Sequence, residues 1–363
     1  MEVIPQVILK NKLSDRVQKK IFLCDVALFM NRKSFCLAMG EFGMEKNNNG
    51  GTENLCLMTG NANPELAKKI SEYIGVELFD TFVGRFNNGE TQVMINNSIR
   101  GRDIFIIQPT SQPVNDNLMD LLIMVDACKR ASARSITAVV PYYAYARQDR
   151  KTRGREPISA KLVANLMVAA GMTRVVTVDL HAGQIQGFFD IPVDHLAAAP
   201  VFADYFSAHD FGGELVVVSP DLGGVTRARI LADFLKAPIA IIEKRRPRPG
   251  EAEVMNIIGD VKGKIALMID DIVDTAGSLC EGAKALQRLG AKSVLAACSH
   301  AVLSKNAVEK INNSNIEKLV TTDTIPLPTD KPTEKFIVLS MAQSIGDVIL
   351  RIQSHSSVSQ LFR

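Results

Sequence analysis

The sequence predicts an α/β protein with two domains, and its length, composition and alternating pattern carry that prediction. The chain has 363 residues, more than one hydrophobic core usually supports. Hydrophobic residues make up 47% of it and charged residues 22%, an ordinary globular composition. From Leu55 onward, short β-branched runs alternate with amphipathic stretches. Strands that are apolar on both faces and separated by helices indicate parallel sheets covered on each side.

Seven apolar runs are expected to form strands, and four amphipathic stretches are expected to form helices. The strands are predicted at residues 104–107, 136–140, 175–178, 215–218, 239–242, 265–269 and 294–297. The helices are predicted at residues 117–130, 157–170, 225–234 and 279–289. We place the break between the domains near IPVDHLAAAP, so that the first spans residues 55–196 and the second 197–344. A C-terminal helix at 345–363 is expected to rejoin the first domain.

Residues 1–54 show no domain pattern. The run Ile21–Met30 follows two lysines and resembles a weak signal sequence. It contains Asp25, and it is shorter than the about 20 apolar residues that span a bilayer. The stretch NNNGGTEN, residues 47–54, is typical of a flexible linker. We interpret residues 1–54 as a dispensable or mis-assigned extension in preference to a targeting segment.

The net charge and the cysteine content limit the binding partners and the cellular compartment that we expect for this protein. The formal net charge of +3 is too near zero to indicate nucleic acid or membrane binding by itself. The six cysteines form no CxxC pair and no zinc spacing. Cys128 and Cys280 lie in helix-like stretches and are interpreted as buried thiols. We therefore expect a cytoplasmic protein with no nucleic-acid or membrane partner.

The stretch LMIDDIVDTAGS, residues 267–278, carries the strongest chemical signal. Asp270 and Asp271 follow a predicted parallel strand, and residues 274–278 lead into the next predicted helix. Free backbone N–H groups at a helix start, among small residues, suit a phosphate group. The acidic pair suits adjacent sugar hydroxyls or a metal that holds them. We expect Asp274 to offer its backbone, or to turn its side chain towards the sugar. The alternative is an ordinary capped turn.

This stretch resembles the phosphoribosyl pyrophosphate loop shared by phosphoribosyltransferases and phosphoribosyl pyrophosphate synthases. Further motifs resemble the synthases, the ribose-phosphate pyrophosphokinases of bacterial type. They are VDLHAGQIQGFFDIPVDHL at 178–196, GRFNNGET at 84–91, NDNLMDLLIM at 115–124, PYYAYARQDRK at 141–151, SPDLGG at 219–224 and the terminal SVSQLF. The resemblance runs from about Met58 to the last residue. It implies two phosphoribosyltransferase-like domains, each a mainly parallel sheet covered by helices.

The resemblance implies a ribose-phosphate diphosphokinase, which converts ATP and ribose 5-phosphate into phosphoribosyl pyrophosphate and AMP. The product feeds nucleotide, histidine and tryptophan biosynthesis. One-step diphosphoryl transfer needs an in-line pose, a metal and positive charge on the moving oxygens. By resemblance, Mg²⁺ is faced by His181 and Asp221, with Asp179 as a further candidate ligand. Asp179 could instead orient His181 or cap its strand.

The remaining site residues follow from the same resemblance. Lys244 and Arg246, in the basic segment EKRRPRPGEAE at 243–253, are expected to be catalytic. Pro247 and Pro249 predict a projecting loop there. A solvated loop or a grip on a nucleic-acid backbone would also explain those basic residues. ATP binding is assigned to Phe86, Asn88, Glu90, Arg147, Gln148 and Asp149. Ribose 5-phosphate binding is assigned to Asp270, Asp271, Asp274, Thr275, Ala276, Gly277 and Ser278.

The alternation of Phe86, Asn88 and Glu90 would place them on one side of an extended segment. Part of the ATP pocket is expected from a neighbouring subunit, which implies a homo-oligomer, commonly a hexamer. Phosphate activation and ADP inhibition are family properties that the sequence does not test. Two departures are modest: Asn88 replaces an acid, and Ser278 stands where threonine is commoner. The alternative functions are a phosphoribosyltransferase and a non-catalytic regulatory subunit of such a synthase.

Overall fold

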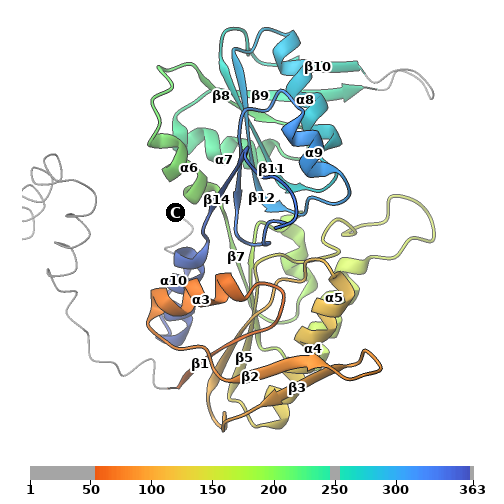
Figure 1. Ribbon diagram of the computed structural model, residues 1–363, viewed down its shortest axis with the longest axis vertical. Helices are drawn as coiled ribbons and strands as arrows, with labels where there is room; N and C mark the ends of the chain where they lie inside the picture. Colours follow the sequence, from red (N-terminus) through yellow and green to blue (C-terminus); the bar gives the residue numbers. More distant parts are fainter. Residues whose placement is uncertain (1–53, 246–253, 360–363) are drawn as a thin grey trace, which may run out of the picture. The chain divides into compact units, whose positions relative to one another are not determined.

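The computed structural model describes residues 54–245 and 254–359, which form two β-sheets, a hairpin and their flanking helices (Figure 1). This arrangement confirms the predicted α/β class. Each of the seven predicted strands and four predicted helices is present, with ends that differ by a few residues. In the described ranges no helix is both long and apolar enough to cross a membrane. Cys128 and Cys280 are buried free thiols, as predicted.

The first sheet has five parallel strands in the order β1-β4-β5-β6-β7. They are β1 (Leu55–Thr59), β4 (Asp103–Ile107), β5 (Ser135–Val140), β6 (Arg174–Val178) and β7 (Val193–Leu196). The helices of this part are α3 (Pro64–Ile74), α4 (Val114–Arg130), α5 (Ser159–Ala170) and the 3₁₀ turn η1 (Gly183–Phe188). Alternate residues of the buried strands face opposite sides, so α4 and α5 pack on one face and α3 on the other.

The second sheet has seven strands in the order β10-β9-β8-β11-β12-β13-β14, and only the β9–β10 pair is antiparallel. The strands are β8 (Leu215–Ser219), β9 (Ile239–Arg245), β10 (Val254–Ile258), β11 (Ile265–Val273), β12 (Ser293–Ala301), β13 (Leu319–Thr322) and β14 (Phe336–Leu339). Its helices are α6 (Ala199–Ser207), α7 (Val225–Leu235), α8 (Gly277–Arg288) and α9 (Ala307–Asn312). Helices α8 and α9 pack on one face, and α6 and α7 on the other.

One hydrophobic core cluster contains residues of both sheets. Phe105 and Val176 of the first sheet belong to the same cluster as Val217 and Leu267 of the second. The last helix, α10 (Ala342–Gln353), follows β14 and lies beside α3, on the first sheet's side (Figure 1). The domain limits at residues 196 and 344 stay a prediction.

Four sequence predictions differ from the structure in detail. The C-terminal helix runs from Ala342 to Gln353, and residues 354–359 are not part of it. Strand β11 continues past Ile269 to Val273, because β12 keeps pairing with it up to Ala301. Strand β9 continues to Arg245, because β10 pairs with it and both prolines of the basic segment come later in the chain.

The fourth difference concerns Phe86, Asn88 and Glu90, which are not in an extended segment. They lie in the tight turn of a hairpin formed by β2 (Thr81–Arg85) and β3 (Thr91–Ile95). Phe86 N–H donates to the Glu90 carbonyl, and Gly89 N–H donates to the Phe86 carbonyl. The glycine has φ +89°, which lets the chain reverse here. The alternation argument for one shared side was therefore wrong.

Candidate active site

An acidic pair occupies the end of β11. Asp271 is 3% exposed, and its backbone N–H donates to Asp270 Oδ1 at 2.9 Å. Burial, together with the adjacent Asp271 carboxylate, raises the pKa of Asp270 to about 8. Burial alone would also raise the pKa of Asp271, but hydrogen bonding from His181 and the charge of Arg227 hold it well below its usual range. Asp271 is thus the more readily ionised carboxyl group of the pair, and Asp270 the less readily ionised one.

Two side chains from other elements hold this pair. Arg227 of α7 places Nη1 at 3.2 Å from Asp271 Oδ1 and 3.7 Å from Asp270 Oδ1. His181, in the turn after β6, places Nδ1 at 2.7 Å from Asp271 Oδ2. That hydrogen bond raises the pKa of His181 above its ordinary value. The last residues of β11 therefore form a charged cluster with one residue from the first sheet's side and one from α7.

The turn between β11 and α8 begins at Asp274 and leaves the helix N-terminus open. Ala276 has φ +58°, and no side chain caps the first turn of α8. A Cβ atom on Gly277 would meet only Thr275 Oγ1, at 4.0 Å. The structure thus leaves free space beside the backbone N–H groups of this turn, as a bound anion requires.

The Asp274 side chain is engaged by two other residues of the chain, while the prediction that its backbone contacts the ligand stays a prediction. One oxygen accepts from Arg147 Nη2 at 2.5 Å, and the other accepts from the Ser304 hydroxyl. Arg147 belongs to the segment after β5. Because a guanidinium neutralises the carboxylate, the turn offers less repulsion to an anion than its sequence suggests.

We call the cavity around this turn the loop pocket. Its volume is about 230 Å³, and it is lined by Arg147, His181, Pro220, Asp221 and residues 270–279. All seven residues predicted to bind the sugar phosphate line this one cavity. Their common location agrees with the prediction, but their roles remain to be tested.

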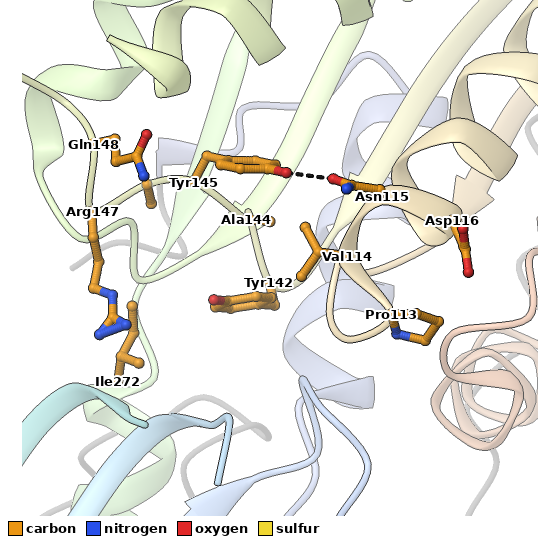
Figure 2. Close-up of a pocket in the computed structure, with 11 residues that line it drawn as sticks. Pro113, Val114, Asn115, Asp116, Tyr142, Ala144, Tyr145, Arg147, Gln148 and Ile272 are labelled. Atoms are coloured by element: carbon orange, nitrogen blue, oxygen red, sulfur yellow. Dashed lines mark hydrogen bonds between the residues drawn. The ribbon is translucent and has the colours of Figure 1, made fainter. Parts of the chain in front are cut away.

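A second cavity, the tyrosine pocket, has a volume of about 490 Å³. It is lined by residues 113–116, Tyr142, residues 144–148 and Ile272. Figure 2 shows the Tyr145 hydroxyl directed at the Asn115 side chain, and Arg147 extended towards Ile272. Arg147 and Ile272 line both this cavity and the loop pocket, so the two adjoin.

A third cavity, the wide pocket, has a volume of about 1030 Å³. It shares His181, Asp221 and the acidic pair with the loop pocket, and Arg227, Asp149 and Asp179 also line it. Of the predicted ATP residues, Arg147 and Gln148 therefore line the tyrosine pocket, and Asp149 lines the wide pocket.

The predicted metal-facing residues meet where the loop and wide pockets join. Asp221 follows β8, and its Oδ1 accepts from Gly224 N–H at 2.8 Å. His181 has its Nδ1 on a carboxylate, an arrangement that orients metal-ligating histidines, and Nε2 is left for a metal. Across residues 54–245 and 254–359, no three His, Cys, Asp or Glu side chains gather as a ready metal site. A magnesium ion held mainly by phosphate oxygens fits this donor set.

Asp179 is engaged within the protein. Its Oδ2 accepts from the Ser299 hydroxyl and from Ala198 N–H, the latter at 3.2 Å. Neither Ala198 nor Ser299 belongs to the predicted metal-facing residues. The carboxylate thus already has a structural task, whatever its part in metal binding.

Three predicted residues line none of these three pockets, and two others cannot be placed because they lie wholly or partly outside the described structure. Phe86, Asn88 and Glu90 are exposed in the hairpin turn and line none of them. The backbone of Lys244 lies in β9, paired with Met255, while its side chain lies outside the described structure. Arg246 is also outside the described residues.

Arg227 and Ser304 were missed by the sequence analysis. Arg227 is in the first turn of α7, the helix that follows β8. Because β8 pairs directly with β11, the start of α7 lies near the acidic pair. A basic residue soon after the motif SPDLGG was the available signal. Ser304 carried no signal, since its approach to Asp274 depends on the chain reversal after β12.

Models of two known families match this chain. The N-terminal domain of ribose phosphate pyrophosphokinase matches residues 55–171, and the phosphoribosyl synthetase-associated domain matches residues 245–363. Neither match includes residues 1–54.

Curated relatives and a solved structure agree with these matches. The ribose-phosphate pyrophosphokinase of Bacillus subtilis (strain 168) is 58% identical over 315 residues, which cover 87% of this chain and 99% of that protein. That of Corynebacterium ammoniagenes is 58% identical over 309 residues, covering 85% and 97%. The crystal structure of phosphoribosylpyrophosphate synthetase from Mycobacterium smegmatis matches with a TM-score of 0.80 and 42% identity, covering 84% of this chain and 100% of that one.

Proposed function

The chain belongs to the ribose-phosphate pyrophosphokinase family, and we propose that its three adjoining pockets hold the two substrates and the metal of that family's reaction. As a ribose-phosphate diphosphokinase, it transfers the diphosphoryl group of ATP to the 1-hydroxyl of ribose 5-phosphate. The new bond joins that hydroxyl oxygen to the β-phosphorus. The bond between the β-phosphorus and the oxygen of AMP breaks, and AMP leaves.

Ribose 5-phosphate occupies the loop pocket. Its phosphate accepts hydrogen bonds from the backbone N–H groups of residues 275–278, where the space beside Gly277 is open. Its hydroxyls donate to Asp270 and Asp271, which line the same cavity. The ion pair between Arg147 and Asp274 supports this placement. It neutralises the Asp274 carboxylate, which would otherwise repel the phosphate.

ATP occupies the tyrosine pocket, with its phosphates directed at the loop pocket. The observation that carries this proposal is that Arg147 lines both cavities. A triphosphate that enters along Arg147 brings its β-phosphorus towards the sugar, as in-line transfer requires. Aromatic walls from Tyr142 and Tyr145 suit a purine base.

Magnesium is the usual metal of this family, and His181 and Asp221 are the residues placed to hold it together with the ATP phosphates. The ion would neutralise charge on the phosphate oxygens. His181 keeps its ring orientation through Asp271, and binding at Nε2 requires loss of the proton there. Asp221 is fixed by the Gly224 N–H and is exposed to the shared space.

Lys244 and Arg246 supply positive charge to the moving diphosphoryl group. The proposal for these two residues rests on the sequence resemblance. The β9–β10 hairpin supports it in one respect, because it places Lys244 one residue before the end of β9.

A second copy of the chain completes the ATP pocket with its β2–β3 hairpin. Phe86 is 50% exposed and lines none of the three pockets described above, which supports an intermolecular role. We propose a homohexamer in the cytoplasm, with phosphate activation and ADP inhibition as in the bacterial-type family. A role for nucleic acid or a membrane forms no part of this proposal.

The reaction is tested by product analysis with Mg²⁺, ATP and ribose 5-phosphate. We expect AMP and phosphoribosyl pyrophosphate in equal amounts, and a fall in turnover of about 10³-fold or more for Lys244→Ala. Formation of ADP would show transfer of a single phosphoryl group and refute the mechanism. Substrate binding without turnover would favour the regulatory-subunit alternative.

A further inference from the structure

The turn between β6 and His181 has an unusual backbone. Asp179 has φ +36°, in the left-handed region that L-residues with a side chain rarely adopt. His181 follows two residues later. A strained residue persists only where its surroundings fix it, and such residues gather at functional sites.

Groups from two strands, β7 and β12, fix this turn. Asp179 N–H donates to the Leu196 carbonyl at 2.9 Å, and Leu180 N–H donates to His195 Nε2 at 2.8 Å. His300 Nε2 lies 3.1 Å from the Val178 carbonyl and 3.2 Å from the Asp179 carbonyl. The Ser299 hydroxyl donates to the Asp179 carboxylate. Backbone and side chain of the strained residue are therefore both held.

The contacts from Ser299 and His300 come from the other sheet. Both residues are on β12, whereas Val178 ends β6. His300 is 2% exposed, and burial lowers its pKa. Since carbonyl groups only accept, Nε2 carries a proton, and Nδ1 lies 2.9 Å from the Thr324 hydroxyl oxygen. The Thr322 hydroxyl donates to the Ser299 carbonyl at 2.6 Å, which holds the same segment of β12.

We propose that Ser299 and His300 are positioning residues for His181, and that Asp179 serves this turn rather than the metal. The inference rests on the proposed role of His181 as a metal-facing residue. β12 also pairs with β11 beside the acidic pair, with Asp270 opposite Cys298 and Ile272 opposite His300. One strand thus contacts both the segment with the acidic pair and the turn that leads to His181.

Two substitutions at Asp179 separate this role from metal ligation. Both glycine and alanine lack the carboxylate, but glycine adopts a left-handed φ without strain whereas alanine does not. We expect Asp179→Gly to retain clearly more activity than Asp179→Ala. Both variants also lose the carboxylate that Ser299 contacts, so Ser299→Ala is the matched comparison. Mn²⁺ binding in the presence of ATP, followed by electron paramagnetic resonance, should be as strong in Asp179→Gly as in Ser299→Ala. A loss of Mn²⁺ affinity in both Asp179 variants that Ser299→Ala does not show would make Asp179 a ligand and overturn the proposal.

Substitutions at His300 test the contact from β12. His300→Leu removes the donor, and we expect kcat to fall about ten- to 100-fold with a higher Mg²⁺ requirement and an unchanged KM for ribose 5-phosphate. His300→Gln keeps an N–H donor and should restore most of that loss. His209→Leu, at an exposed position just after α6, is the matched control. A lower melting temperature with unchanged kcat and Mg²⁺ requirement would show a purely structural role and refute the proposal.

If His300→Leu does not fold, the variants Asp179→Gly and Asp179→Ala still test the proposal. The unaltered chain is assayed first for phosphoribosyl pyrophosphate formation. Its failure to form product would contradict the proposed function, whereas the Mn²⁺ comparison of the two Asp179 variants with Ser299→Ala still tests the role of the turn.

Discussion

Gly277 has space beside it that the protein itself does not fill. A Cβ atom there would meet only Thr275 Oγ1 at 4.0 Å, and the residue begins α8. Packing within the chain therefore does not require glycine. The requirement comes from the group that the loop pocket binds, which the proposal identifies as the 5-phosphate.

We predict that Gly277→Ala leaves the melting temperature unchanged or slightly raised, since alanine is the better helix former. The KM for ribose 5-phosphate should rise about tenfold or more, because a charge-assisted hydrogen bond worth roughly 1.5–3 kcal/mol is disturbed. Steady-state kinetics and thermal unfolding measure the two effects. Gly187→Ala is the control, since a Cβ there also meets nothing within 4 Å but the residue lines none of the three pockets. An unchanged KM in Gly277→Ala would place the phosphate elsewhere.

Arg227 provides the positive charge that the acidic pair requires. It contacts both carboxylates, and its side chain is only 18% exposed. Without it, the buried Asp271 carboxylate would keep only His181 as a basic partner, and Asp270 would lose its contact with Arg227. We predict that Arg227→Met lowers kcat/KM for ribose 5-phosphate at least about tenfold, because removing one partner leaves buried charge uncompensated.

The same substitution two residues along α7 is the control for Arg227. Arg229 is exposed on that helix and lines none of the three pockets, so Arg229→Met should leave the kinetics unchanged. Arg227→Lys, which keeps the charge but not the planar fork, should fall between the two. Equal kinetics for Arg227→Met and Arg229→Met would show that Arg227 does not contribute to the reaction.

The β2–β3 hairpin is the element whose role depends most on a second copy. Its turn carries Phe86, Asn88 and Glu90, and none of them lines the loop, tyrosine or wide pocket. Phe86→Ala and Lys244→Ala therefore damage different parts of each composite site. We predict that each variant alone is poorly active, and that dissociating and reassembling an equal mixture restores roughly a quarter of full activity, as random pairing of subunits requires. No recovery from a properly reassembled mixture would mean that one chain supplies both residues.

The elements were predictable to different degrees from sequence. Strands apolar on both faces, such as β4, β5 and β8, were found because their runs are nearly continuous. The hairpin strands β2 and β3 are half exposed and were missed as a pair. The end of β11 was placed too early because Asp270 and Asp271 look like a strand boundary, whereas pairing with β12 continues beyond them. Tertiary pairing of this kind has no local signature.

The site was predictable where its residues are contiguous in sequence. Residues 270–278 and the segment from Arg147 to Asp149 were found from motifs, and they do line adjoining cavities. Arg227, Ser304 and His300 were not assigned, because each acts on a residue at least 30 positions away in sequence. Such contacts depend on the fold that brings β6, β11 and β12 together.

At the scale of the whole molecule, both sheets contribute residues to the proposed active site. The first sheet supplies Arg147 and His181 from the segments after β5 and β6, and the second supplies the acidic pair and the phosphate turn. A core cluster that includes residues of both sheets supports this joint site. Residues 1–54 lie outside both family matches, and we propose that they contribute nothing to the active site. Their removal should leave turnover and assembly unchanged, and loss of either would contradict that proposal.

The most direct test of the joint site is a crystal structure with Mg²⁺, ribose 5-phosphate and an ATP analogue. A methylene group between the α- and β-phosphorus atoms of the analogue blocks the bond cleavage that transfer requires. We predict the 5-phosphate on the backbone N–H groups of residues 275–278, the ribose hydroxyls at Asp270 and Asp271, and the triphosphate along Arg147. A sugar phosphate bound in the wide pocket or the tyrosine pocket, with the turn beside Gly277 free of phosphate, would contradict the proposed site.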